Sequence, residues 1–136
     1  MADDIKHIKG TKSAADRYFL GTNVFGSHKA AENLSKNETS VGVLFFYTGY
    51  LEISGKNGWR VQSVVKSLGS VYSDENTNGR QDKPESKKTY NLIAVAENSK
   101  NDGKIYVSAD ATAFSDALQR VYGNQIMVLD AIRFLT

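Results

Sequence analysis

The chain has 136 residues, 40% hydrophobic and 24% charged, with 17 basic and 15 acidic side chains and a net charge of +2. This balance argues against disorder and against nucleic acid as a partner. The absence of cysteine excludes disulfides, a thiolate nucleophile and a cysteine-ligated zinc site. The length predicts a single domain over residues 1–136, and no apolar run is long enough to insert into a membrane.

The first part of the chain carries the weakest pattern. Residues 1–25 are predicted as an irregular arm or, over residues 13–20, as one or two helical turns closed by Gly21. Ser27 then stands where an N-cap would begin a short helix that runs to Leu34.

The strands are predicted from short runs of apolar, β-branched and aromatic residues bounded by turn residues. Residues 41–47 are the most apolar run and are predicted as a central strand, and the alternating residues 50–53 as a more exposed strand segment. Residues 59–68 and 90–97 are predicted as further strands. The turn at residues 98–103 makes residues 90–97 and 104–107 antiparallel neighbours.

The last third of the chain predicts a buried strand, a polar turn and a closing helix. Residues 105–107 form the apolar strand, and Asn124 is predicted to cap the helix. The predicted apolar stripe of this helix contains Ile126, Met127, Leu129, Ile132, Phe134 and Leu135, opposite Gln125, Asp130 and Arg133. A strand followed by a helix that returns across the sheet predicts an α/β fold, with a layered mixed sheet of about four to five strands flanked by helices.

A polar loop at residues 74–85 fits the pattern D-x-[DN]-x-[DN]-G-x5-E at every specified position. Ca²⁺ prefers six to eight oxygen ligands on a tightly curled loop. The predicted ligands are Asp74, Asn76, Asn78, the carbonyl of Arg80, Asp82 and a bidentate Glu85. Lys83 and Pro84 would break a helix after the loop, so a helix–loop–helix hand is not expected. The alternative is an ordinary surface loop, because Asn, Asp and Gly all favour turns.

Two further residues are candidates for ligand binding, and neither is assigned a catalytic role. Asp110 follows a predicted strand at its carboxyl end, where open α/β sheets bind ligands, although an aspartate there also caps turns and helices. His28 and His7 are the only histidines and lack the spacing of a metal site. The sequence contains neither a nucleophile elbow nor a glycine-rich phosphate loop.

Several segments of residues 24–136 resemble one family. Residues 107–110, 114–118, 123–124 and 129–135 resemble the ending V-x-G-D-S-D-F-x-S-N … G-N-x-x-L-x-x-N-A-x-x-W-L of auxiliary, substrate-binding-like proteins of uncharacterised and gliding-motility-type ABC transporters. Upstream, residues 26–34 resemble the segment H-P-I-T … L of these proteins, and residues 90–97 resemble their strand L-A-V-A-x-E.

The resemblance implies part of a flavodoxin-like or class I glutamine amidotransferase-like α/β domain, extracytoplasmic and attached to membrane transporter subunits. The chain differs from the family at Lys29 and Ala30, which replace Pro-Ile, and at Ala109, which replaces a glycine. The first strands of that domain are also missing, and amidotransferase chemistry would need the cysteine that the chain lacks.

Two functions are therefore carried forward. The first is a non-enzymatic binding or assembly module of an ABC-transporter auxiliary protein, with transporter subunits or other proteins as partners and Ca²⁺ as the expected ion. The alternative is a hydrolase-like enzyme that uses Asp110 and His28 at the edge of the sheet. An enzyme of this kind needs the two side chains within hydrogen-bond reach of each other, directly or through one water.

Overall fold

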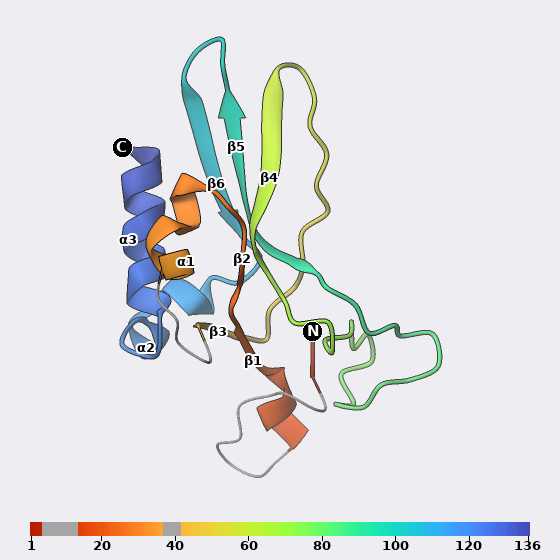
Figure 1. Cartoon of the computed structure of the whole chain (residues 1–136). Coiled ribbons are helices and arrows are strands. Elements are labelled where there is room, and N and C mark those ends of the chain that lie inside the picture. Colours follow the sequence, from red (N-terminus) through yellow and green to blue (C-terminus); the bar gives the residue numbers. More distant parts are fainter. Residues whose placement is uncertain (4–13, 37–41) are drawn as a thin grey trace.

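The computed structural model of the chain describes residues 1–3, 14–36 and 42–136 (Figure 1). The elements in chain order are η1 (Ala14–Tyr18), β1 (Phe19–Thr22), β2 (Val24–Phe25), η2 (Lys29–Ala31), α1 (Glu32–Lys36), β3 (Val43–Phe46), β4 (Trp59–Lys66), β5 (Asn91–Asn98), β6 (Gly103–Ser108), η3 (Thr112–Phe114), α2 (Asp116–Gln119) and α3 (Asn124–Leu135), where η marks a 3-10 helix. They form one sheet of four strands in the order β2-β4-β5-β6 and one two-stranded sheet, β1-β3.

The four-stranded sheet is built from strands that the sequence predicts. β4 and β5 pair antiparallel from Trp59 opposite Asn98 to Lys66 opposite Asn91, with register shifts on either side of Val65. β5 and β6 form the predicted antiparallel hairpin, which closes with Gly103 opposite Asn98. These strands are rich in β-branched and aromatic residues, which favour the pleated backbone.

The helices lie on one side of the four-stranded sheet (Figure 1). The core between the two layers is apolar and consists of Leu20, Ala30, Ala31, Leu34, Val43, Phe45, Val64, Val65, Val71, Tyr90, Leu92, Ile93, Val95, Ala113, Met127 and Phe134. The predicted α/β content, with a layered sheet flanked by helices, is therefore confirmed. All pairs between the named strands are antiparallel, and the parallel βαβ units of a flavodoxin-like fold are not confirmed.

The amino-terminal half differs from the prediction in its elements. Residues 14–18 form η1, in line with the alternative of one or two helical turns, whereas residues 19–22 and 24–25 form β1 and β2 rather than an irregular arm. Residues 4–13 lie outside the described residues. The short helix after residue 27 exists as η2 and α1, but its N-cap is His28 instead of Ser27. Ring Nδ1 of His28 accepts a hydrogen bond from the amide of Ala30, which is the contact that defines the cap.

The most apolar run of the chain is not the central strand of the main sheet. β3 pairs only with β1, in the two-stranded sheet. Val43 and Phe45 are nevertheless fully buried. An apolar run signals burial on both faces, and this burial does not require a central position in a large sheet. The second predicted segment, residues 50–53, makes a single bridge between Leu51 and Asn91 and is not a strand.

The closing helix α3 forms where the sequence predicts it but buries a different face. Asn124, Met127, Asp130, Ala131 and Phe134 are buried. Three residues of the predicted apolar stripe are instead exposed, at 46% for Leu129, 52% for Ile132 and 48% for Leu135. Met127 and Phe134 are buried as predicted, but the prediction is wrong for Leu129, Ile132 and Leu135, because two buried polar side chains, described below, turn the helix toward their partners.

β6 is also more exposed than predicted, because it lies at the edge of the sheet with Ile105 and Val107 partly open to solvent. Among the described helices, none is long and apolar enough to cross a membrane.

Candidate functional site

The 74–85 loop lies within the connection between β4 and β5, residues 67–90, and projects away from α1, α2 and α3 (Figure 1). Gly79 has a φ of 68°, in the left-handed region that glycine adopts at little cost. The carboxylate of Asp74 accepts hydrogen bonds from the amides of Asn78, at 3.2 Å, and Gly79, at 2.8 Å. The loop is therefore curled around the side chain of its first residue, with Gly79 at the bend.

The end of the loop is held in the same way. The carboxylate of Glu85 accepts hydrogen bonds from the amides of Glu75, at 3.0 Å, and Asp82, at 2.8 Å. The side-chain amides of Asn76 and Asn78 both donate to Oδ2 of Asp82, at 2.7 and 2.9 Å. Carboxylates at the first and last positions thus close the loop on itself.

Two residues of η1 anchor the loop, and sequence reasoning missed both. The hydroxyl of Tyr18 donates to Oδ2 of Asp74 at 2.7 Å, and the guanidinium of Arg17 donates to the carbonyl of Gly79. Burial raises the pKa of Tyr18, and the hydrogen bond to Asp74 raises it further, so the phenol stays a donor. No short motif signals these contacts, because 56 and 62 residues separate the partners.

The donor set of the loop matches the chemistry that Ca²⁺ prefers, since its side chains offer carboxylate and amide oxygens. A carboxylate has about four lone-pair positions. Asp74 accepts three hydrogen bonds, and Asp82 and Glu85 accept two each. All three therefore keep positions for a cation.

The present arrangement is not that of a formed metal centre. Over residues 1–3, 14–36 and 42–136, no group of three or more His, Cys, Asp or Glu side chains is placed to hold a metal ion. The side-chain oxygen of Asn76 accepts from the backbone amide of Asn78, and that of Asn78 accepts from the backbone amide of Arg80. The side-chain nitrogens of both asparagines donate to Asp82. Ligation would need both amides to turn their oxygens toward the carboxylate of Asp82.

The side chain of His28 is largely buried, with 10% of it exposed, and its ring packs edge-on against Phe134 of α3. Its Nδ1 accepts from the amide of Ala30, so its Nε2 carries the proton and donates to Oε2 of Glu97 at 3.2 Å. Arg60 donates to the same oxygen at 3.0 Å. The hydrogen bonds from His28 and then Arg60 hold the pKa of Glu97 below its usual value. Arg60 and Glu97 are cross-strand partners, so this pair could be found once β4 and β5 are paired.

Asp110 faces the interior of the fold rather than a ligand cleft. Its Oδ2 accepts from the amide of Phe46 at 3.0 Å, and its Oδ1 accepts from the amide of Thr112 at 2.7 Å. The side chain is 6% exposed. It therefore joins the end of β6 to β3 and to the beginning of η3, which is the capping role that the sequence left as its alternative.

The structure does not bring Asp110 and His28 together. In the part of the chain that it describes, the side chain of Asp110 bonds the amides of Phe46 and Thr112, and the side chain of His28 bonds the amide of Ala30 and the carboxylate of Glu97. Neither side chain bonds the other.

Gly123 and Asn124, which carry part of the family resemblance, complete a junction around β3. The amide of Gly123 donates to the carbonyl of Gly42 at 2.7 Å, and a Cβ at Gly123 would lie 2.6 Å from that oxygen. Asn124 is fully buried and exchanges two hydrogen bonds of 2.8 Å with the backbone of Leu44. A third bond, at 3.0 Å, goes to the carbonyl of Ala113. The predicted N-cap is therefore wrong, because Gly123 is the N-cap of α3. The side chain of Asn124 instead links α3 to β3 and η3 inside the fold.

Asp130 is the second buried polar residue of α3, and the sequence placed it on the polar face opposite the predicted apolar stripe. Its carboxylate accepts from the amides of Asn33 and Leu34, at 2.9 and 3.1 Å, and from the side chain of Asn33 at 2.6 Å. It is 1% exposed. The carboxylate of Asp130, on α3, thus accepts from the backbone amides of the first turn of α1 and caps that helix.

Comparison of the chain with protein-family models, with curated proteins and with solved structures gives no match.

Proposed function

We propose that the chain is a non-enzymatic binding or assembly module of an extracytoplasmic ABC-transporter auxiliary protein, and that its 74–85 loop holds a structural Ca²⁺. The proposal of a binding or assembly module rests on the role of residues in the segments that resemble the transporter family. Asp110, Gly123 and Asn124 all join β3 to the carboxyl-terminal elements by hydrogen bonds. The resembling segment therefore serves the architecture of the module, which is what a shared scaffold for protein partners requires.

The hydrolase-like alternative draws no support from the same contacts. A general base needs an acceptor nitrogen free to reach a substrate. Nδ1 of His28 already accepts from Ala30, and both carboxylate oxygens of Asp110 accept from backbone amides. Activity would require the imidazole of His28 to leave Ala30 and to come within reach of Asp110, and the two side chains do not bond each other.

The transporter assignment is tested by binding. Membrane vesicles that contain the transporter subunits encoded beside this chain should retain the purified chain, and vesicles without these subunits should not. Equal recovery from both preparations would contradict the proposal. A panel of ester, amide and phosphoester substrates, with Asp110→Asn as the control, tests the alternative, because turnover lost in the variant would favour the hydrolase.

Two observations support Ca²⁺ binding: the complete spacing of ligand residues in the sequence and the curled shape of the loop. The loop carries Asp74, Glu75, Asp82 and Glu85 within twelve positions, and a divalent cation would relieve their mutual repulsion. Extracellular modules commonly bind calcium with Kd of about 10⁻⁴–10⁻³ M, so a weak site would fill outside the cytoplasm. Because the loop lies in the connection between β4 and β5 and both Asp74 and Glu85 are 8% exposed, the ion would be structural.

Thermal unfolding with calcium and with chelator tests this second part. At a calcium concentration about 100 times Kd, binding to the folded state alone adds about 2.7 kcal/mol. We expect Glu85→Gln to lose this gain, because it removes the bidentate ligand. The matched control is Glu75→Gln, which removes an exposed carboxylate at a position that supplies no ligand. An unchanged midpoint in the parent, or equal behaviour of the two variants, would contradict calcium binding.

A further inference from the structure

Among the strands of residues 1–3, 14–36 and 42–136, none pairs with the outer edge of β6. This strand is the last in the order β2-β4-β5-β6. The amide of Ala109 donates to the carbonyl of Leu92 at 2.9 Å, which shows that Ala109 points its backbone toward β5. Alternate residues of an antiparallel strand point their N–H and C=O groups to opposite sides. Lys104, Tyr106 and Ser108 therefore direct theirs away from the sheet.

This edge lacks the features that keep edge strands apart. Such strands are commonly protected by proline, by bulges or by charged side chains. β6 contains no proline and pairs with β5 without a register shift. Its one charged residue is Lys104, whose ammonium lies 5.6 Å from the ring centroid of Phe134 on α3. The edge is thus regular and nearly neutral.

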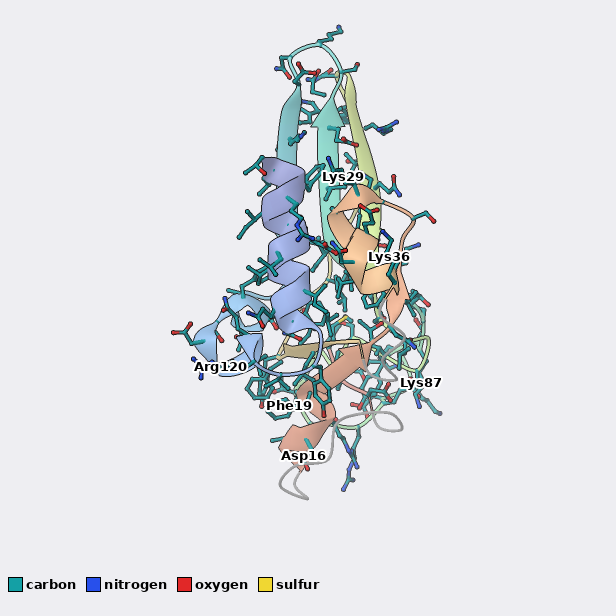
Figure 2. The ribbon with its side chains drawn as sticks, turned by 60° about the vertical axis from the view of Figure 1, so that its left-hand side comes forward. Asp16, Phe19, Lys29, Lys36, Lys87 and Arg120 are labelled. Carbon is teal, nitrogen blue, oxygen red and sulfur yellow. The ribbon has the colours of Figure 1, made fainter. Side chains whose placement is uncertain are left out.

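One flank of α3, next to the outer edge of β6, is apolar. Asp130 points to α1, since its carboxylate caps that helix. Residues two apart on a helix point in nearly opposite directions, so Val128 and Ile132 lie on the side away from α1. Figure 2 shows α1 and α3 side by side in front of the sheet, and the flank of α3 away from α1 lies above β6. Ile132 is 52% exposed there, and Leu135 on the next turn is 48% exposed.

We propose that β6 and this flank of α3 form the interface of a homodimer. Strand β6 would pair antiparallel with β6 of a second copy about a two-fold axis at Tyr106, and α3 would pack against α3 of that copy. The outward backbone groups of Tyr106 then bond their own equivalents, and those of Lys104 bond Ser108 of the second copy. In this register Ile105 lies directly opposite Val107 of the second copy, in the closer type of antiparallel pair.

A second copy fits this surface better than a different partner because the surface is self-complementary. A two-fold interface places the same patch on both subunits, so a charged patch would repel itself. The exposed apolar side chains are Ile132 and Leu135 on the flank of α3 and, on the opposite face of the sheet, Ile105 and Val107. The register sets Lys104 against a serine rather than another lysine. A partner recognised by charge would find little to pair with here.

β6 and α3 also reach the proposed two-fold axis at the same height along the molecule. Lys104 lies beside Phe134, and two residues along a strand span about the same length as four residues along a helix. Tyr106 is therefore level with the turn of α3 that contains Asp130 and Ile132. The two Ile132 side chains of the dimer would lie close to each other at the axis.

The test is a concentration series of the full chain in sedimentation equilibrium, with circular dichroism to confirm folding. We expect a dimer with a Kd of about micromolar. Ile132→Glu should raise this Kd at least about tenfold, because two carboxylates would meet at the axis. Arg133→Glu is the matched control on the exposed neighbouring position and should leave the Kd within about threefold.

A second pair of variants tests the strand itself. Lys104→Pro removes one outward N–H while sparing the bonds to β5, and proline is tolerated at strand edges. It should weaken the dimer at least about tenfold, whereas Lys104→Ala, which keeps the N–H, should have little effect. A parent that stays monomeric up to about millimolar concentration would overturn the proposal. A dimer that is insensitive to either Ile132→Glu or Lys104→Pro would also overturn it.

Discussion

Two sets of polar side chains in this molecule differ in where their hydrogen bonds go. The hydrogen bonds between residues of the 74–85 loop join partners that are near in sequence, such as Asn76 and Asn78, two residues apart, and Glu75 and Glu85, ten residues apart. At the junction around β3 and α3, the bonds of Asp110, Asn124 and Asp130 reach partners 64, 80 and 97 residues away. The bonds within the loop can form without the rest of the fold, and only the anchors from Tyr18 and Arg17 need it, whereas the junction set exists only in the complete fold.

The junction set should therefore carry much more of the global stability than the loop set. Asn124→Ala gives the largest expected effect. It would leave the amide and carbonyl of Leu44 and the carbonyl of Ala113 without their side-chain partner inside the protein. Each unsatisfied buried group costs about 1–3 kcal/mol, so the free energy of unfolding should fall by about 3–5 kcal/mol. Urea unfolding of the parent and variant measures this difference.

Two further variants sharpen the result for Asn124. Gln125→Ala, on the exposed neighbouring residue, should change stability by less than about 0.5 kcal/mol. Asn124→Asp keeps the acceptor for Leu44 but loses both donated bonds, and it should still destabilise. If Asn124→Ala cost no more than Gln125→Ala, the comparison between the two sets would fail.

The two sides of α3 give the second prediction. Asp130→Ala removes three hydrogen bonds to α1 and should cost about 2–3 kcal/mol. Ile132→Ala should cost less than about 0.5 kcal/mol at concentrations where the chain is monomeric, because this side chain is 52% exposed. Sequence reasoning predicts the reverse order, with a loss of about 2–5 kcal/mol for Ile132→Ala as a core residue. Denaturation curves of the two variants therefore decide which face α3 buries.

Elements were predictable where a local pattern and tertiary burial agree. The runs that form β4, β5 and β6 are rich in strand-forming residues, and the turn at residues 98–103 sets the pairing of the last two. α3 shows where such reasoning ends. Its Leu129, Ile132 and Leu135 form a regular apolar row, but Asp130 fixes the rotation of the helix through Asn33, 97 residues away. A pattern within one helix contains no information about such a partner.

The candidate sites divide in the same way. The 74–85 loop was recognisable because its polar residues and Gly79 lie within one short pattern, and its curled backbone matches that pattern. Its anchors Tyr18 and Arg17 were not recognisable, since they come from a distant segment. The sequence indicates that Asp110 follows the end of a strand, but only the fold reveals its amide partner on β3.

The junction residues are both buried and bonded to partners distant in sequence. Glu97 has distant partners without being buried, so it separates these two properties. Its partners His28 and Arg60 are 69 and 37 residues away, yet its side chain is 31% exposed. If burial decides the contribution, Glu97→Gln should cost less than about 1 kcal/mol at pH 7, as is usual for solvent-exposed ion pairs. A loss comparable with that of Asn124→Ala would show instead that range alone decides it.

The pH dependence of the Glu97 contacts gives the smallest expected effect. His28 and Arg60 hold the pKa of folded Glu97 below the value of about 4.3 for an unfolded chain. The stabilisation is then fully present above about pH 4.3 and is lost as the pH falls through the folded pKa, because protonation removes the charge that the partners bind. The difference in unfolding free energy between the parent and Glu97→Gln should therefore be present at pH 7 and shrink toward zero below that folded pKa. Glu52→Gln, which removes an exposed carboxylate elsewhere, is the matched control. A difference that stays constant across this pH range would mean that Glu97 acts through packing and not through its charge.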